Sequence, residues 1–295
     1  MLARAAVRLQ SAIALGIAVI STAIVLAVAP WWLAVMGPLL GLGYRTAALR
    51  PIVRRERLAA APVPEAWREL LSRRVPFYGR LTPAAQRRFE GDVAVFLGEH
   101  RIYGPQGAEV PEEVKVMIGA GAAMLIHGRP DWEWPHVRDI VVHPTQWNED
   151  GEAGDHHGIA GQVHMQGPVL FSRKQIRFGF RKSDGENVVL HKLAHVLDMA
   201  DGSADGSPDR FAWTAVPGWD DMVRSRLKAV RKRQAGPLRA YAGTNSAELF
   251  AVAVEVFFEQ PARLRKQDPN LYEALATLFN LDPDTGALRR PLPAA

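Results

Sequence analysis

The sequence of 295 residues contains no cysteine. Disulfide bonds and thiolate metal sites are therefore excluded, and any metal ion must be bound by histidine and carboxylate side chains. The absence of cysteine also agrees with a domain in a reducing compartment such as the cytoplasm. The chain has no internal repeat, and its length suits one large domain or two small ones.

Charged side chains are missing from residues 9–44. Within this stretch, residues 11–29 are almost unbroken apolar positions, and their number is close to the roughly 20 residues that a helix needs to cross a bilayer. Trp31 and Trp32 follow, as in the aromatic belt at a membrane surface. The shorter apolar run at 33–44 fits either a re-entrant return or the second leg of a tight hairpin.

The arginines that flank the apolar stretch predict its orientation. Two arginines precede it within residues 1–10, and five follow it within residues 45–61. The positive-inside bias places the C-terminal portion in the cytoplasm, at the inner membrane. A cleaved signal peptide is the alternative, since residues 27–29 read Ala-Val-Ala. Pro30 and the apolar residues after it argue against cleavage.

The predicted organisation is therefore a short flank (1–10), a transmembrane segment or hairpin (11–44), a basic juxtamembrane linker (45–61) and one domain (62–295). Apolar periodicity and capping residues predict a helix-rich α+β fold for that domain. We expect helices at 65–81, 82–100, 111–128, 187–199, 219–234 and 246–260, strands at 137–144 and 167–172, and a loop followed by strands across 145–176.

The net charge of +5 is concentrated at residues 45–57 and 224–234. A membrane flank and a solvated helix face explain these two clusters, and neither is interleaved with the aromatic side chains that single-stranded nucleic acid favours. We therefore expect no nucleic-acid partner.

Residues 187–199, "NVVLHKLAHVLDM", carry His191 and His195. On a helix, residues spaced i and i+4 project from one face, which is the spacing by which two histidines bind one zinc ion. Histidine pairs at this spacing are also common on helices that bind no metal. A metal site therefore needs a third ligand.

Two glutamates can supply that ligand. Glu248 and Glu255 lie seven residues apart on an apolar helix, roughly on the same face, where an unpaired carboxylate is costly. Asp198 and Asp201, directly after the histidine pair, can act as outer acceptors for a histidine N–H group.

Five ordered segments between about Pro62 and Leu281 resemble the Mlc titration factor A family of zinc-dependent peptidases, which is related to the protease domain of anthrax lethal factor. The segments are "PVPEAWRELLSRRVPFYGRL", "GPVLFS", "NVVLHKLAHVLDMADGSADG", "YAGTNSAELFAVAVEVFFEQP" and "LYEALATLFNLDP". The resemblance implies a zincin-like metallopeptidase domain with a small β-sheet.

Carried over by position, the resemblance implies that His191, His195 and Glu248 bind Zn²⁺. Tyr241 then corresponds to the tyrosine that stabilises the oxyanion or protonates the leaving group. Glu255 becomes a supporting residue rather than a ligand. The family commonly has His-Glu-Phe-Ala-His where this chain has His-Lys-Leu-Ala-His, so Lys192 occupies the position of the general base.

Lys192 puts catalysis in question. A protonated lysine has three donors and no acceptor, so it cannot take a proton from water, whereas a general base contributes about 10²–10⁴-fold to the rate. Its positive charge also weakens metal binding, unless the ammonium group turns away or loses its proton; a neutral lysine is itself a possible base.

Two functions therefore remain open at this point. One is a membrane-anchored, aminopeptidase-like zinc metallopeptidase, acting on peptide or protein, with impaired catalysis. The other is a non-catalytic scaffold, a pseudoenzyme that sequesters a partner such as a transcriptional regulator, as the family's founding member is named for doing.

Overall fold

The computed structural model describes residues 2–130, 132–134, 137, 139–144, 168–202, 204–207, 216–234 and 236–292. They form two compact units, one of Met1–Ala61 and one of Pro62–Leu292. The loop predicted at 145–167 lies outside the described residues. Each unit is considered by itself.

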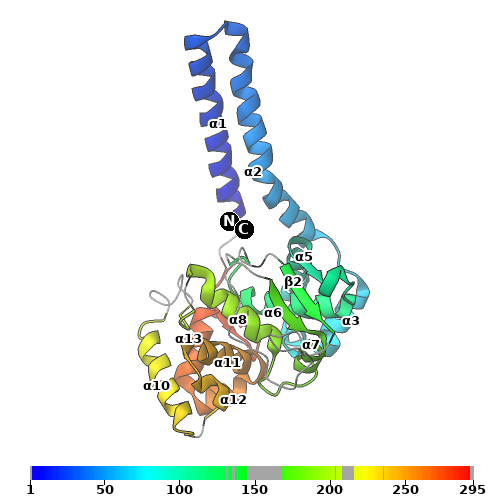
Figure 1. Cartoon of the computed structure of the whole chain (residues 1–295), viewed down its shortest axis with the longest axis vertical. Helices are drawn as coiled ribbons and strands as arrows, with labels where there is room; N and C mark the ends of the chain where they lie inside the picture. Colours follow the sequence, from blue (N-terminus) through cyan, green and yellow to red (C-terminus); the bar gives the residue numbers. More distant parts are fainter. Residues whose placement is uncertain are drawn as a thin grey trace. The chain divides into compact units, whose positions relative to one another are not determined.

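The first unit is a helical hairpin (Figure 1). Helix α1 (Leu2–Val28) is followed by the short 3-10 helix η1 (Trp31–Val35) and by α2 (Met36–Ala60), which runs back along α1. Residues 36–44 of the apolar run thus lie in α2, on the return leg of this hairpin. The segment predicted as a linker at 45–61 is instead almost entirely helical, because α2 continues without a break to Ala60.

Small residues allow the two helices of the hairpin to approach closely. A Cβ atom added at Gly41 would lie 2.6 Å from the Ala14 carbonyl oxygen, and one added at Gly37 would lie 2.0 Å from the Thr22 hydroxyl. The Tyr44 hydroxyl also donates a hydrogen bond to Gln10 Oε1 at 2.6 Å. Close packing of this kind is typical of helix pairs in membranes.

Among the described residues, one helix is long and apolar enough to cross a membrane, at Ala6–Val28. Its outer face exposes large apolar side chains, including Leu15, Val19 and Ile20. Trp31 and Trp32 at the tip of the hairpin are also exposed.

The second unit is helix-rich. Its helices are α3 (Glu65–Arg74), α4 (Pro76–Arg80), α5 (Pro83–Glu99), α6 (Glu112–Ile126), α7 (Arg173–Gly179), α8 (Val188–Asp198), α10 (Trp219–Arg231), α11 (Ser246–Glu259), α12 (Pro261–Gln267) and α13 (Pro269–Leu278), with 3-10 turns η2 (Pro105–Gly107), η3 (Met199–Asp201) and η4 (Ala240–Gly243). The helix predicted at 65–81 is broken at Val75, because the residue before a proline is disfavoured in helical conformation.

Two small sheets complete this unit and confirm the α+β prediction. Strands β1 (Arg101–Tyr103), β2 (Asp139–His143) and β3 (Val169–Ser172) form a parallel sheet in that order, with Ile140 opposite both Ile102 and Val169. Strands β4 (Leu281–Asp282) and β5 (Ala287–Leu288) form an antiparallel pair. The strands predicted at 137–144 and 167–172 are both present.

Helix α11 is the centre of the core. Every residue from Ala247 to Phe258 is buried, as expected for a helix that is apolar on all sides. Helix α8 packs between α11 and α6. Asparagine side chains cap both central helices: Asn187 accepts from Val189 N at 3.1 Å, and Asn245 accepts from Glu248 N at 2.8 Å. These caps fix where each helix begins.

We expect Gly121→Ala to destabilise this unit by about 1–3 kcal/mol. A Cβ atom at Gly121 in α6 would lie 2.4 Å from Val189 Cγ1 of α8, and a β-branched valine in a helix has little rotamer freedom to yield. The overlap outweighs the gain of about 1 kcal/mol that alanine brings to a helix. The urea midpoint of the detergent-solubilised chain measures the effect.

Gly79→Ala is the matched control, since a Cβ atom there meets nothing within 4 Å. Equal midpoints for the two alanine variants would show that α6 and α8 do not depend on this close approach.

Candidate metal centre

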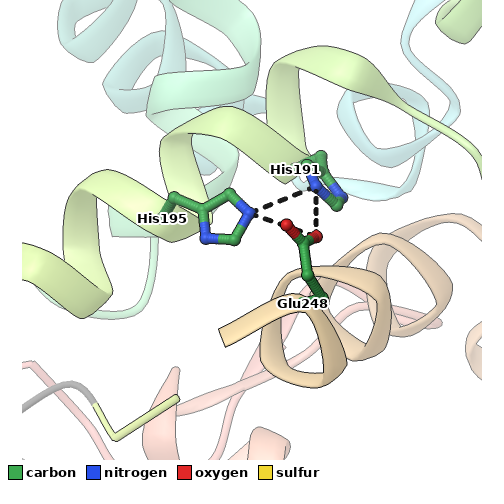
Figure 2. A group of neighbouring side chains, drawn as sticks. All are labelled: His191, His195 and Glu248. Carbon is green, nitrogen blue, oxygen red and sulfur yellow. Dashed lines mark hydrogen bonds and ion pairs between the residues drawn. The ribbon is translucent and has the colours of Figure 1, made fainter. Parts of the chain in front are cut away.

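Helix α8 presents His191 and His195 to α11 (Figure 2). Both side chains are buried, with 4% and 5% of their surface exposed. Their Nε2 atoms face one another at 3.2 Å. Two imidazole nitrogens at this distance repel each other through their lone pairs unless a proton or a cation lies between them. A metal ion at this position would need a third ligand.

Glu248, in the first turn of α11, offers that third ligand. Its Oε2 atom lies 3.0 Å from His191 Nε2 and 3.4 Å from His195 Nε2, and the residue is only 2% exposed. Figure 2 shows the three side chains converging from the two helices on one point. The structure thus brings together the three residues that the sequence analysis assigned to the metal.

The three atoms fit a zinc ion. With ligands about 2.0–2.1 Å from a tetrahedral metal, two ligand atoms lie about 3.3 Å apart. The observed separations of 3.0, 3.2 and 3.4 Å are close to that value. Two imidazoles and one carboxylate also match a catalytic zinc site, which leaves a fourth position open.

The second carboxylate of α11, that of Glu255, contacts the other ring nitrogen of His191. Glu255 Oε1 lies 2.7 Å from His191 Nδ1, on the opposite edge of the imidazole from Glu248. This contact directs the other ring nitrogen, Nε2, toward the converging group. Glu255 is therefore positioned to orient His191, and its oxygens lie outside the Nε2 cluster.

Sequence reasoning did not identify Arg239, which forms an ion pair with Glu255. Its Nη1 atom also donates to the Gly185 carbonyl at 3.0 Å, and its guanidinium lies 5.9 Å from the centre of the Tyr241 ring. The sequence did indicate that Glu255 has a cationic partner, because a carboxylate buried on an apolar helix needs a cation.

The charges of this cluster shift its pKa values. Burial works to lower the pKa of His191, but the Glu248 and Glu255 carboxylates outweigh it and raise that pKa. Burial lowers the pKa of His195, assisted by the positive charge of His191. Burial alone would raise the pKa of Glu248, yet the hydrogen bonds and charges of the two histidines lower it to about 2. Glu248 is thus an anion at neutral pH.

Tyr241 lies at the edge of the cluster in η4, with its ring 6.0 Å from that of His191. Burial, followed by the charge of Glu248 and a hydrogen bond to it, raises the pKa of Tyr241 to about 12. The hydroxyl therefore keeps its proton and can donate it. Helix α10 holds the η4 turn, because Arg231 donates to the carbonyls of Gly243 and Thr244.

Lys192 is half-buried beside His191. Burial lowers its pKa, the negative charge of Glu248 opposes that shift, and the charge of Lys192 in turn lowers the pKa of His195. The ammonium group thus lies within electrostatic range of the cluster. Of the two predicted outer acceptors, Asp198 is buried and accepts from Gly206 N at 3.0 Å, whereas the side chain of Asp201 lies outside the described residues.

Comparison with known proteins identifies relatives over most of the chain. Residues 50–280 match the family described as glucose-regulated metallo-peptidase M90. An uncharacterized protein of Synechocystis sp. is 28% identical over 250 residues, which cover 78% of this chain and 89% of that protein. Mlc titration factor A of Cronobacter sakazakii is 26% identical over 251 residues, covering 80% and 92%. The same protein of Klebsiella pneumoniae is 26% identical over 234 residues, covering 74% and 86%.

Proposed function

Because the chain belongs to the glucose-regulated metallo-peptidase M90 family, we propose that it is a membrane-anchored, metallopeptidase-like protein that binds Zn²⁺ through His191, His195 and Glu248. The observation that carries this proposal is the convergence of three buried ligand atoms at 3.0–3.4 Å. The proposal includes a zincin-like fold for the domain at 62–295.

Zinc bound in this group would polarise a scissile carbonyl and activate a water molecule for attack. The surrounding residues then have distinct tasks. Glu255 keeps the Nδ1 side of His191 occupied, so that Nε2 stays directed at the metal position. Tyr241 donates its hydroxyl proton in a hydrogen bond to the oxyanion that develops on the substrate.

Lys192 leaves the proton of the attacking water without an acceptor. We therefore propose that hydrolysis of peptides, with an aminopeptidase-like mode, is strongly reduced in this protein. Comparing metal content and peptide hydrolysis between the chain and Lys192→Glu tests the proposal.

The same lysine supports a second candidate function. A scaffold that retains its metal-binding group but has lost its base is suited to binding a protein without cleaving it. Relatives at 26% identity are named for the titration of Mlc. We propose sequestration of a protein partner, such as a transcriptional regulator, as the alternative function.

We expect Arg239→Gln to lower zinc affinity by about 10–100-fold, the usual effect of removing an outer partner of a metal-binding histidine. Without the guanidinium, Glu255 loses its countercharge and no longer holds His191 Nδ1 in a fixed direction. Competition with a chromophoric zinc chelator measures the affinity.

Arg226→Gln is the control for this measurement, because it removes an arginine that pairs with Asp268 instead. Unchanged zinc affinity in Arg239→Gln would show that Glu255 does not need its arginine partner.

We propose that the helical hairpin anchors the chain in the inner membrane, with residues 11–44 in the bilayer and the second unit in the cytoplasm. The exposed apolar side chains of α1 and the arginines that follow Tyr44 support this. The full chain should remain with membranes after an alkaline carbonate wash, whereas a chain that begins at Pro62 should stay in the supernatant.

Release of the full chain by carbonate would contradict anchoring. The mass of the membrane-bound protein separates an anchor from a signal peptide, since cleavage after Ala29 would shorten the chain by the first 29 residues.

A further inference from the structure

A hollow that is partly open to solvent lies away from the Nε2 cluster, at the ends of α3, α7 and α11. We call it the basic hollow, because its wall contains Arg73, Arg74, Arg181 and Lys182. Asn187 and Glu259 also line it. Two segments that are distant in the sequence thus place four cationic side chains around one opening.

Among the residues that the structure describes, these four cations have no ion-pair partner. Within the described part of the chain, no carboxylate forms a salt bridge with any of them; Arg181 only stacks over the Phe178 ring, at 5.7 Å. Two acids of the same loop have other contacts: Asp184 accepts from the backbone of Glu186, and Glu186 lies 4.0 Å from Arg239. The Asp184 carboxylate is close enough to repel Glu259, so it offsets part of the positive charge of the hollow. Like charges gathered without partners repel one another, and a bound anion relieves that repulsion.

Glu259 does not cancel this positive charge. Its carboxyl oxygens accept hydrogen bonds from the Asn187 side chain at 3.1 Å and from Gly185 N at 2.9 Å. Burial has the largest effect and raises the pKa of Glu259 to about 8. The two hydrogen bonds oppose this increase, and the repulsion of nearby acids adds to it. The raised pKa reduces the negative charge that Glu259 contributes at neutral pH.

The chemistry of these groups favours an oxyanion such as a phosphate group over a cationic or an apolar ligand. Arginine guanidinium groups present paired donors that match the oxygens of phosphate, and lysine adds a point charge. A cationic ligand would be repelled by the four side chains of the wall. An apolar ligand would leave them unpaired.

The basic hollow lies at the ends of α8 and α11, the two helices that carry the proposed metal ligands. Asn187 caps α8, the helix of His191 and His195, through hydrogen bonds from Val189 N and Leu190 N. Glu259 is the last residue of α11, the helix of Glu248. The hydrogen bond between Asn187 and Glu259 therefore joins the ends of the two helices at the floor of the hollow.

We propose that the basic hollow binds a phosphate group, free or as a phosphate ester, between the basic side chains of α3 and of the segment after α7, above the Asn187–Glu259 contact.

The test uses the full chain in detergent after removal of metal with a chelator, so that phosphate cannot bind through a metal ion. Inorganic phosphate and methyl phosphate are titrated by isothermal calorimetry at fixed ionic strength, with chloride as the competing anion. We expect saturable binding of phosphate. Binding of both probes identifies the shared phosphate group, and binding of inorganic phosphate alone identifies the free ion as the ligand.

Arg74→Gln combined with Arg181→Gln should weaken this binding at least tenfold, and both positions are exposed, so the variant is expected to fold. Arg224→Gln combined with Lys228→Gln on α10 removes the same charge elsewhere and should leave the binding unchanged. Equal binding by the two double variants would overturn the proposal, as would the absence of saturable binding in the unaltered chain. Either result leaves the metal-centre proposal untouched, because no metal is present in the measurement.

Discussion

Lys192→Glu is expected to raise peptide hydrolysis by about 10²–10⁴-fold, the contribution of a general base. Lys192 lies half-buried beside His191, within electrostatic range of Glu248 and His195. A carboxylate at the same position can accept the proton of the attacking water, which a protonated ammonium cannot. The measurement is the initial rate of peptide cleavage by the zinc-loaded chain and by the variant, at equal metal content.

Lys192→Gln separates the two effects of the lysine. Glutamine removes the positive charge that opposes a metal dication but supplies no base, so zinc affinity should rise in both variants while hydrolysis rises only with glutamate. Equal hydrolysis in the chain and in Lys192→Glu would refute the proposal of impaired catalysis. A loss of hydrolysis in Lys192→Gln would instead identify a neutral lysine as the base.

Glu248→Gln is expected to lower zinc affinity by more than the roughly 10–100-fold that loss of an outer partner costs. Within the described residues, Glu248 supplies the carboxylate of the Nε2 cluster, with Oε2 at 3.0 and 3.4 Å from the two nitrogens. The uncharged amide has nearly the same size but cannot replace an anion that balances a dication. Competition with a chromophoric chelator gives the affinity, and metal analysis after dialysis gives the occupancy.

Glu273→Gln makes the same chemical change at an exposed position of α13, where the carboxylate pairs with Arg289. It should keep the zinc affinity of the unaltered chain. If Glu248→Gln also keeps it, the third ligand is another residue, and the assignment of Glu248 is wrong.

The metal-binding group could be predicted from the sequence because its geometry is mostly local. A spacing of i and i+4 places His191 and His195 on one face of any helix, and the Asn187 cap fixes where that helix begins. The buried carboxylates of α11 were visible as charges on an otherwise apolar helix. Which of them faces the histidines was implied by the resemblance to known peptidases, and the structure places Glu248 at the Nε2 atoms and Glu255 at Nδ1.

What the sequence by itself determined is therefore the residues of the candidate site, the helices that carry them, the apolar stretch at the N-terminus and the lysine that follows His191. The tertiary structure decided the parallel order of β1, β2 and β3, the Arg239–Glu255–His191 arrangement and the basic hollow. These features depend on contacts between residues far apart in the chain, such as Asn187 and Glu259, which no local periodicity reports. Pairing across such distances is set by how the core packs, so it becomes visible only once the helices are assembled.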